Sequence, residues 1–183
     1  MTRRKTPTPD TVPRRGAIVI ADQADFTATV LRRGANAALE MIWAIRRHLI
    51  PVFRDRGGEV YKIEGDNLFV FFNRANDALT ASLAAHQELE RISARRKYPI
   101  RIGIGIGFGD LLYLPSEDDY YGAEVNLASK LGEDLAEGGE TLLTHSAIAA
   151  LEPPLPGRAG AKRNAKVSDV RLRFQAWLRS IPE

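Results

Sequence analysis

The segment from Gly57 to Phe72 limits the possible folds most, because its residue pattern is that of a β-hairpin. The run 68–72 is rich in β-branched and aromatic residues, which are typical of strands, and Gly57-Gly58 marks a turn before the first strand. Gly65-Asp66 falls midway, where a two-residue turn joins hairpin strands, and glycine at the first position favours a type II′ turn. The sequence therefore predicts two short antiparallel strands with Asp66 at their turn and Lys62 four residues earlier.

Patterns on both sides of this hairpin predict an α+β fold. Residues 16–21 form an apolar run of strand length, and residues 27–55 and 75–97 have apolar side chains at helical spacing. Residues 99–109 alternate isoleucine with arginine or glycine, which is the period of a strand, and their glycines favour a close backbone approach. The order is β-α-β-β-α-β, that of a ferredoxin-like core with a mainly antiparallel sheet and helices packed on it.

The rest of the chain predicts an added αβ(α)β extension of the same domain. The expected elements are a strand at 110–114, a helix at 121–136, a strand at 140–144, a helical turn at 145–151, a proline-containing loop at 152–165 and a strand at 167–177. We expect three parts: a disordered basic arm over residues 1–15, one folded domain over residues 16–179, and a tail over residues 180–183.

Composition and charge exclude several classes of protein. The 183 residues contain no cysteine, which excludes a disulfide framework, a thiolate metal site and a cysteine nucleophile. The formal net charge of +3 comes from basic ends, whereas residues 16–151 are net acidic, so we expect no nucleic-acid partner. No apolar run is long enough for a membrane span, and the basic N-terminal residues lack the apolar region of a secretory signal, so we expect a cytoplasmic protein.

Acidic residues remain as the candidates for chemistry, because the glycine motifs that bind phosphate are absent. There is no P-loop sequence, and the glycines of residues 103–109 do not open a helix as in a Rossmann motif. Asp22 ends the first predicted strand, which lies beside the hairpin in a β-α-β-β sheet, so Asp22 can face Asp66. The two carboxylates would repel each other unless a cation such as Mg²⁺ or Mn²⁺ lay between them. From these two positions alone, a metal site and two ordinary loop aspartates both remain open.

Three segments match, in order, the motifs of one enzyme family. Residues 22–27, Asp-Gln-Ala-Asp-Phe-Thr, are similar to a metal motif Asp-Ile-x-Gly-Phe-Thr. Gly57-Gly58 followed by residues 62–66, Lys-Ile-Glu-Gly-Asp, resembles a Gly-Gly…Lys-Thr-Ile-Gly-Asp hairpin, and residues 119–131 resemble Asp-x-x-Gly-x-x-Val-Asn-x-Ala-Ser-Arg-Leu. The chain thus resembles the class III nucleotidyl cyclase catalytic domain over residues 16–151, with the strand at 167–177 as a closing strand.

The resemblance implies an adenylate cyclase that converts ATP to 3′,5′-cyclic AMP and pyrophosphate. It implies two Mg²⁺ or Mn²⁺ ions held by Asp22, Asp66 and the backbone of Gln23. Lys62 and Asp119 would read adenine, since an ammonium donates to the ring nitrogen and a carboxylate accepts from the exocyclic amine, a pattern that guanine inverts.

Further implied roles concern the ribose, the phosphates and the assembly. The residues are Asn126 for the ribose, Lys130 for charge developing at the α-phosphate, and Phe26, Thr27 and Arg101 for the triphosphate. A late phosphate-binding lysine of the family has two candidates here, Lys162 and Lys166. The resemblance also implies a homodimer with active sites at the interface, in which Asp22 and Asp66 come from the same subunit as Lys62 and Asp119 or from the facing one.

Three departures from the motifs leave alternatives to an efficient adenylate cyclase. Lys130 stands where the motif has arginine, so the charge is kept but the planar fork that grips phosphate oxygens is lost. Asp25 replaces a glycine of the metal motif, and Glu64 replaces an apolar residue of the hairpin. The alternatives are a catalytically weak, cyclase-like nucleotide-binding or regulatory dimer, and a cyclase for GTP or a pyrimidine triphosphate.

Overall fold

The protein is built on one eight-stranded sheet with helices on both faces. The structure is a computed structural model that describes residues 10–167 and 169–179. The first part of the chain forms β1 (Val12–Gln23), α1 (Phe26–Arg33), α2 (Ala35–Arg54), β2 (Glu59–Glu64), β3 (Asn67–Phe72), α3 (Ala75–Ser93) and β4 (Ile102–Leu114). The second part forms β5 (Asp119–Tyr121), α4 (Ala123–Ser129), the π-helix η1 (Lys130–Leu135), β6 (Thr141–Thr144), α5 (His145–Ala149), β7 (Arg158–Val167) and β8 (Val170–Leu178).

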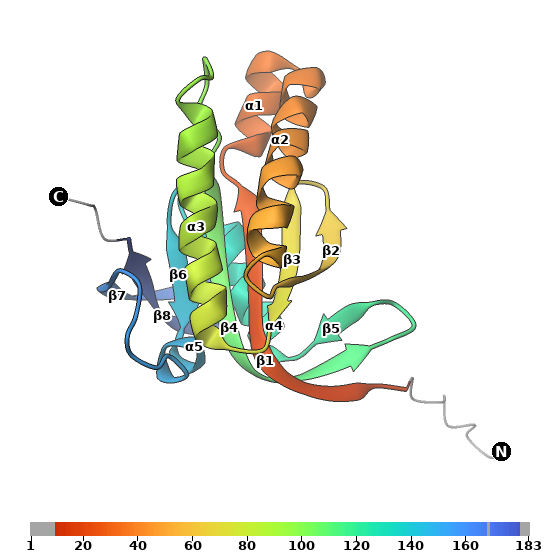
Figure 1. Cartoon of the computed structure of the whole chain (residues 1–183), viewed down its shortest axis with the longest axis vertical. Coiled ribbons are helices and arrows are strands. Elements are labelled where there is room, and N and C mark those ends of the chain that lie inside the picture. The colour runs from red at the N-terminus through yellow and green to blue at the C-terminus, as the bar shows by residue number, and fades with distance from the viewer. Residues whose placement is uncertain (1–9, 168, 180–183) are drawn as a thin grey trace.

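The strand order confirms the predicted α+β fold. The strands follow β2-β3-β1-β4-β6-β8-β7, and the short β5 pairs with the end of β4. Only β4 and β6 are parallel among these described pairs, so the sheet is mostly antiparallel. Figure 1 shows α2 and α3 in front of the sheet and α4 behind it. Within the described residues, no helix combines the length and the apolar character needed to cross a membrane.

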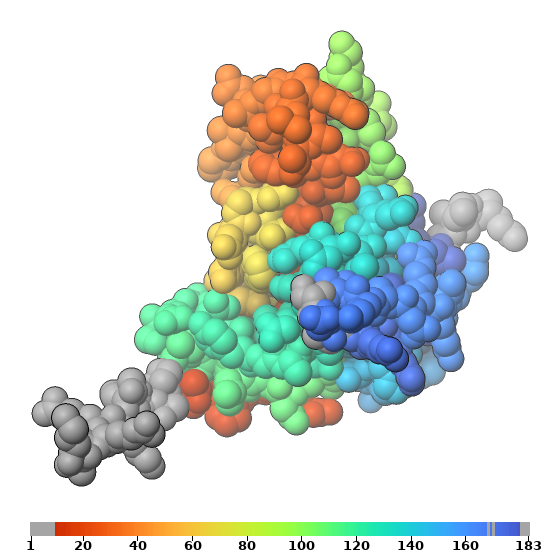
Figure 2. All heavy atoms as spheres, turned by 180° about the vertical axis from the view of Figure 1, so that it is seen from behind, coloured from red at the N-terminus to blue at the C-terminus, as the bar shows by residue number. Residues whose placement is uncertain are grey.

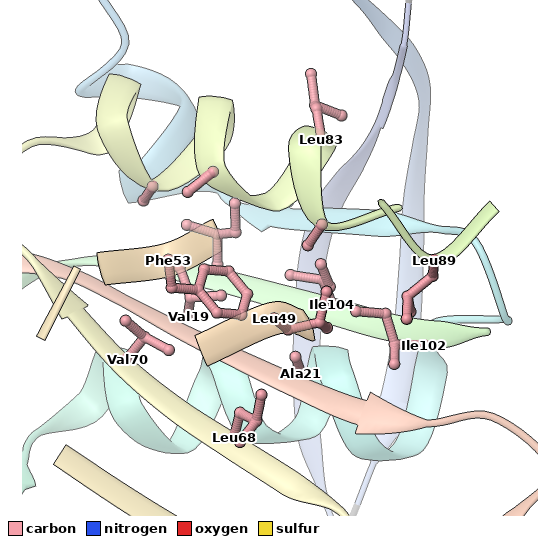
Figure 3. Packing of buried hydrophobic residues seen from close by; sticks show 14 of the residues in the cluster. Val19, Ala21, Leu49, Phe53, Leu68, Val70, Leu83, Leu89, Ile102 and Ile104 are labelled. Atoms are coloured by element: carbon pink, nitrogen blue, oxygen red, sulfur yellow. The ribbon is translucent and has the colours of Figure 1, made fainter. Parts of the chain in front are cut away.

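The front face of the sheet carries the main hydrophobic core. Alternate residues of β1, namely Ala17, Val19 and Ala21, are at most 1% exposed and pack under α2 and α3. Leu49 and Phe53 of α2 lie over this face, as Figure 3 shows, and both are fully buried. Burying a side chain of this size contributes about 1.5–3 kcal/mol. This packing fixes α2 against β1 and β3, whose ends carry the predicted metal carboxylates.

The rear face receives α4 and η1 at short distance because β4 has glycine at every second position. The four glycines on this face of β4 are Gly103, Gly105, Gly107 and Gly109. A Cβ atom at Gly105 would lie 2.1 Å from the carbonyl oxygen of Ala128 and 2.6 Å from the backbone nitrogen of Gly132. The predicted close backbone approach is therefore confirmed, and the element that approaches is the helical segment that carries Asn126 and Lys130.

The N-terminal arm was predicted too long. The sequence predicts a disordered arm over residues 1–15, but Val12 to Arg15 belong to β1 and pair with β4. The basic Arg14 is accommodated in the strand because its guanidinium lies 4.2 Å from the ring centroid of Phe71 and donates to the hydroxyl of Tyr120. Residues 1–9 of the arm and the tail at 180–183 lie outside the described residues.

Several helix and strand boundaries differ from the sequence prediction. The helix expected over residues 27–55 is two helices, because Gly34, with φ of 83°, separates α1 from α2. The strands expected at 99–109 and 110–114 are one strand, β4. The helix expected over residues 121–136 starts at Ala123, after β5, and continues as a π-helix from Lys130.

The loop predicted over residues 152–165 was wrong in its second half, where β7 forms. Its partner strand β8 holds it in place: Gln175 Nε2 donates to the carbonyl oxygen of Gly160 at 2.9 Å. Trp177 Nε1 also donates to the carbonyl oxygen of Pro156 at 2.7 Å. The prolines at the start of this segment are typical of a loop, and β7 begins only two residues after the last of them.

Candidate active site

The hairpin turn between β2 and β3 has the predicted geometry. Glu64 pairs with Asn67, so Gly65 and Asp66 make up the turn. Gly65 has φ of 57°, whereas Asp66 is not among the non-glycine residues with positive φ in the described chain. A positive φ at the first turn position alone is the pattern of a type II′ turn. Arg46 of α2 donates from Nη2 to the carbonyl oxygen of Gly65 at 2.6 Å and so holds the turn from the helix side.

Asp22 and Asp66 come together because β1 pairs with β3. Ala21 lies opposite Leu68, so the next residue of β1, Asp22, lies beside the hairpin turn. Burial raises the pKa of the Asp22 carboxyl to about 7, and the neighbouring Asp66 carboxylate adds to the rise. The ionised form of Asp22 is thus disfavoured at this position, and a nearby positive charge would stabilise it.

The surroundings of these two carboxylates fit a magnesium or manganese ion. They border a hollow of about 500 Å³, whose lining residues are Asp22, Gln23, Asp25, Phe26, Thr27, Ala28 and Asp66. The described residues contain no group of three or more acidic or histidine side chains placed to hold a metal by themselves. Mg²⁺ usually takes one or two carboxylates and completes its shell with water and substrate phosphates, so two carboxylates beside an open hollow suit it.

Asp25 has an unusual backbone conformation at this site. It is the residue before α1 and has φ of 61° and ψ of 24°, the left-handed region in which glycine is favoured. The motif that residues 22–27 resemble has glycine at this position, so Asp25 places a carboxylate where the backbone conformation favours glycine. A non-glycine residue in this region costs on the order of 1 kcal/mol. The Asp25 side chain borders the hollow of Asp22 and Asp66 as well as a second, smaller one.

The predicted triphosphate residues lie around the same loop. Phe26 and Thr27 begin α1, where backbone N–H groups have no partner within the helix and favour anions. Arg101 precedes β4, and its carbonyl oxygen accepts a hydrogen bond from the backbone nitrogen of Ala24 at 3.0 Å. Arg101 borders the smaller hollow, which shares Asp25 and Ala28 with the hollow of the carboxylate pair. Arg101 is therefore beside the metal loop but not in the same hollow.

Lys62 and Asp119 form the predicted pair, although 57 residues separate them in the chain. Lys62 Nζ lies 3.1 Å from Asp119 Oδ2, and Asp119 begins β5. The hydrogen bond to Asp119 raises the pKa of the Lys62 ammonium, so it remains charged near neutral pH. Both side chains border a hollow of about 450 Å³ between β2, β5 and α4.

Asn126 and Lys130 occupy different positions relative to this hollow. Asn126 of α4 borders it, as predicted for a residue that contacts the ribose. Lys130, the first residue of η1, is not among the lining residues, and its Nζ lies 3.8 Å from the Asp134 carboxylate. The structure thus gathers Lys62, Asp119 and Asn126 in one hollow, with Lys130 one helical turn beyond.

Two acidic residues at this hollow have roles that the sequence did not predict. Glu133 of η1 borders the hollow, accepts from Asn67 Nδ2 at 3.3 Å and adds to the rise in the pKa of Asp22. The helical spacing from Asn126 to Glu133 is the signal that could have identified it. Glu64, noted only as a departure from the motif, lies with its Oε2 3.3 Å from Lys62 Nζ.

A fourth and larger hollow lies between α4 and the β7–β8 hairpin. Its volume is about 780 Å³, and Lys166, Arg171 and Arg173 are the basic residues that border it. Lys162, the other candidate for the family's late lysine, does not border it. Figure 2 shows this rear face, on which the yellow β2–β3 hairpin, the turquoise α4–η1 segment and the blue β7–β8 hairpin are neighbours.

The hollow beside Asp22 and Asp66 and the hollow beside Lys62 and Asp119 are separate in this chain. Among the described residues, the hollow of Asp22 and Asp66 and the hollow of Lys62 and Asp119 share no lining residue. The β2–β3 hairpin contributes to both, with Lys62 on its strand and Asp66 at its turn. The chain therefore presents two separate hollows, and the β2–β3 hairpin borders both.

Comparisons with solved structures show which fold this is. A crystal structure titled adenylate/guanylate cyclase/hydrolase from Silicibacter pomeroyi superposes with a TM-score of 0.81 at 24% identity, covering 93% of this chain and 100% of that one. The adenylyl cyclase CyaB from P. aeruginosa gives 0.78 at 21% identity, covering 94% and 97%. The guanylyl cyclase Cya2 gives 0.78 at 19% identity, covering 91% and 92%. The chain has the fold of adenylyl and guanylyl cyclase catalytic domains.

Sequence comparison adds one curated relative. The chain is 26% identical over 135 residues to a Rhizobium meliloti (strain 1021) protein named "Putative adenylate cyclase 3". The match covers 71% of this chain but 22% of the relative, so the chain spans about a fifth of that protein's length. No protein-family model matches the sequence.

Proposed function

We propose that this chain is a nucleotidyl cyclase that converts ATP to 3′,5′-cyclic AMP and pyrophosphate. The observation that carries the proposal is the presence of two complementary half-sites in the cyclase fold. Asp22 and Asp66 form the half suited to divalent ions, and Lys62 with Asp119 forms the half suited to a purine. The solved structures with this fold include adenylyl and guanylyl cyclases, and the curated relative carries an adenylate cyclase name.

Adenine suits the Lys62–Asp119 pair. The Lys62 ammonium donates to the ring nitrogen N1, and Asp119 accepts from the exocyclic amine. The pair is partly withdrawn from water, with 38% of the Lys62 side chain and 20% of the Asp119 side chain exposed, which strengthens its hydrogen bonds.

The reaction is an in-line displacement at the α-phosphorus. The ribose 3′-oxygen forms a bond to phosphorus, the bond to the bridging β-phosphate oxygen breaks, pyrophosphate leaves, and the hydroxyl proton passes to water. Mg²⁺ or Mn²⁺ held by Asp22, Asp66 and the Gln23 carbonyl would activate the hydroxyl and neutralise the phosphates. Asn126 orients the ribose, and Lys130 offers a point charge to the α-phosphate. The backbone of Phe26 and Thr27, together with Arg101, holds the triphosphate.

The two half-sites of one protomer meet those of a second copy in a homodimer. They open into different hollows in a single chain, so a nucleotide that uses both needs the metal half of one protomer and the base half of its partner. A two-fold symmetric arrangement makes two such sites. This arrangement assigns Asp22 and Asp66 to the facing subunit relative to Lys62 and Asp119.

Product analysis tests the proposed activity. Purified protein is incubated with ATP, GTP, CTP or UTP and Mn²⁺, and the cyclic products are separated by chromatography. From ATP we expect cyclic AMP and pyrophosphate in equal amounts. Nucleotide binding without any cyclic product would instead support the weakly active regulatory dimer, for which the motivation is lysine in place of arginine at position 130.

Mixing two inactive variants tests the shared site. Asp66→Asn removes the metal half and Asn126→Ala removes the base half, so each homodimer lacks both sites. After mixing, we expect about a quarter of the wild-type rate, because half the dimers are mixed and each mixed dimer contains one intact site. If all the residues of a site came from one protomer, no mixed dimer would contain an intact site and the rate would not recover. Two separately purified Asp66→Asn samples mixed together provide the control.

A further inference from the structure

The Lys62 ammonium lies between two carboxylates. Its Nζ is 3.1 Å from Asp119 Oδ2 and 3.3 Å from Glu64 Oε2. Glu64 is two residues after Lys62 on β2, so both side chains project from the same face of the strand. All three residues border the hollow assigned to the base.

One carboxylate is enough for adenine. Its Watson–Crick edge offers one acceptor, N1, and one donor group, the exocyclic amine, which Lys62 and Asp119 satisfy. Glu64 then adds a second acceptor that adenine leaves unused. A plain stabilising role is a weak explanation, because 68% of the Glu64 side chain is exposed and such ion pairs contribute little to stability.

Guanine can form hydrogen bonds with this second acceptor. Its edge offers the acceptor O6 next to two donors, N1–H and the exocyclic amine. Suppose that guanine lies one hydrogen-bonding group closer to Glu64 than adenine does. Lys62 then donates to O6, and the Glu64 carboxylate accepts from N1–H and from the exocyclic amine. A carboxylate can take such paired hydrogen bonds, as in bidentate recognition of other planar donors.

We propose that Glu64 is a specificity-determining residue that lets the base hollow accept guanine as well as adenine nucleotides. The proposal rests on the proposed cyclase function for its catalytic consequence, but not for the binding itself. In it, Asp119 and Lys62 read adenine, and Lys62 and Glu64 read guanine. The chain then forms cyclic GMP in addition to cyclic AMP.

The test compares Glu64→Gln with wild type, using kcat/KM for ATP and GTP. Glutamine keeps the shape of the side chain but provides one acceptor oxygen in place of two and loses the charge. We expect wild type to cyclise both nucleotides and the GTP/ATP ratio to fall at least about tenfold in the variant, as for the loss of a good bidentate contact to a base. Glu59→Gln, which removes an exposed carboxylate from the same strand and breaks the 3.1 Å pair with Arg14, should leave the ratio within about twofold.

Binding separates this inference from the proposed activity. 3′-Deoxy-ATP and 3′-deoxy-GTP lack the attacking hydroxyl, so their dissociation constants can be measured by calorimetry even if the protein makes no cyclic product. We expect wild type to bind both and Glu64→Gln to lose affinity selectively for 3′-deoxy-GTP. Wild-type protein that does not bind 3′-deoxy-GTP, or a variant whose affinity ratio equals that of wild type, overturns the role of Glu64. If Glu64→Gln selectively loses affinity for 3′-deoxy-GTP but no cyclic product forms, the proposed activity is wrong and the role of Glu64 in binding stands.

Discussion

Gly105→Ala should destabilise the protein by about 3 kcal/mol or more, at the upper end of what overpacking a core costs. The new Cβ atom would lie 2.1 Å from the Ala128 carbonyl oxygen and 2.6 Å from the Gly132 nitrogen. Both are backbone atoms, so no side chain can turn away, and the α4–η1 segment must move off the sheet. Denaturant unfolding and calorimetry measure this, with an expected fall in melting temperature of about 6–12 °C for a chain of this size.

Gly109→Ala provides the matched control on the same strand and the same face. Its Cβ atom would lie 3.0 Å from Glu124 Cγ, so the contact is with a side chain and not with backbone, although Glu124 Oε2 accepts hydrogen bonds from Phe108 N and Thr144 Oγ1. We expect a loss of less than about 1 kcal/mol, which is usual for substitutions that avoid backbone clashes. Equal losses of stability in the two variants would show that the glycines are needed for the conformation of the strand and not for the close packing of α4 and η1 on it. Because α4 carries Asn126, we also expect Gly105→Ala, but not Gly109→Ala, to lose cyclase activity.

The repeated glycines illustrate what could and could not be predicted from the sequence. Their alternation predicted a strand with a close backbone neighbour, since that information is local. It could not identify α4–η1 as the neighbour, because that contact depends on where the later chain packs. The β7 strand was missed for a related reason: it is stabilised by pairing with β8, while its own residues are polar and follow several prolines.

The candidate site was predicted to the extent that its residues belong to short motifs. The type II′ turn and the Lys62–Asp119 pair were predicted from such motifs, and the structure has both. The part that Glu133 and Glu64 take in the base hollow was not predicted, because their relation to Lys62 and Asp22 depends on distances between separate elements. The assignments of Asp22 and Asp66 to a metal and of Asn126 to the ribose remain predictions.

Asp66→Asn should abolish activity and yet make the metal-free protein more stable. In the proposed mechanism the variant loses a metal carboxylate, and metal-ion stabilisation of several kcal/mol corresponds to about a 10³-fold loss of rate. Without metal, the same substitution removes the carboxylate that repels Asp22. At a half-buried position this relieves about 1 kcal/mol near pH 8.

The pH dependence of stability without metal tests whether Asp22 is the group that Asp66 destabilises. Its pKa is about 7 in the folded protein against 3.8 as the ordinary value, so between these values the folded state binds more protons than the unfolded state. Asp22 by itself therefore lowers the free energy of unfolding as pH rises from about 4 to 7. Burial lowers the pKa of His86 to about 4, which acts in the opposite direction over most of this range, so the quantity to measure is the difference between wild type and Asp66→Asn. The Asp22 contribution should be smaller in Asp66→Asn, though not absent, because burial is the larger cause of the raised pKa.

Addition of metal should then make wild type more stable than Asp66→Asn. Millimolar Mn²⁺ or Mg²⁺ should raise the melting temperature of wild type, more so near pH 8 than near pH 5, because protons compete with the ion for Asp22. Asp66→Asn should respond little. Asp10→Asn, an exposed aspartate before β1, serves as the control and should behave as wild type throughout. If Asp66→Asn were less stable than wild type without metal, the two carboxylates would not be in repulsive contact; if it still gained stability from Mn²⁺, Asp66 would not be a metal ligand.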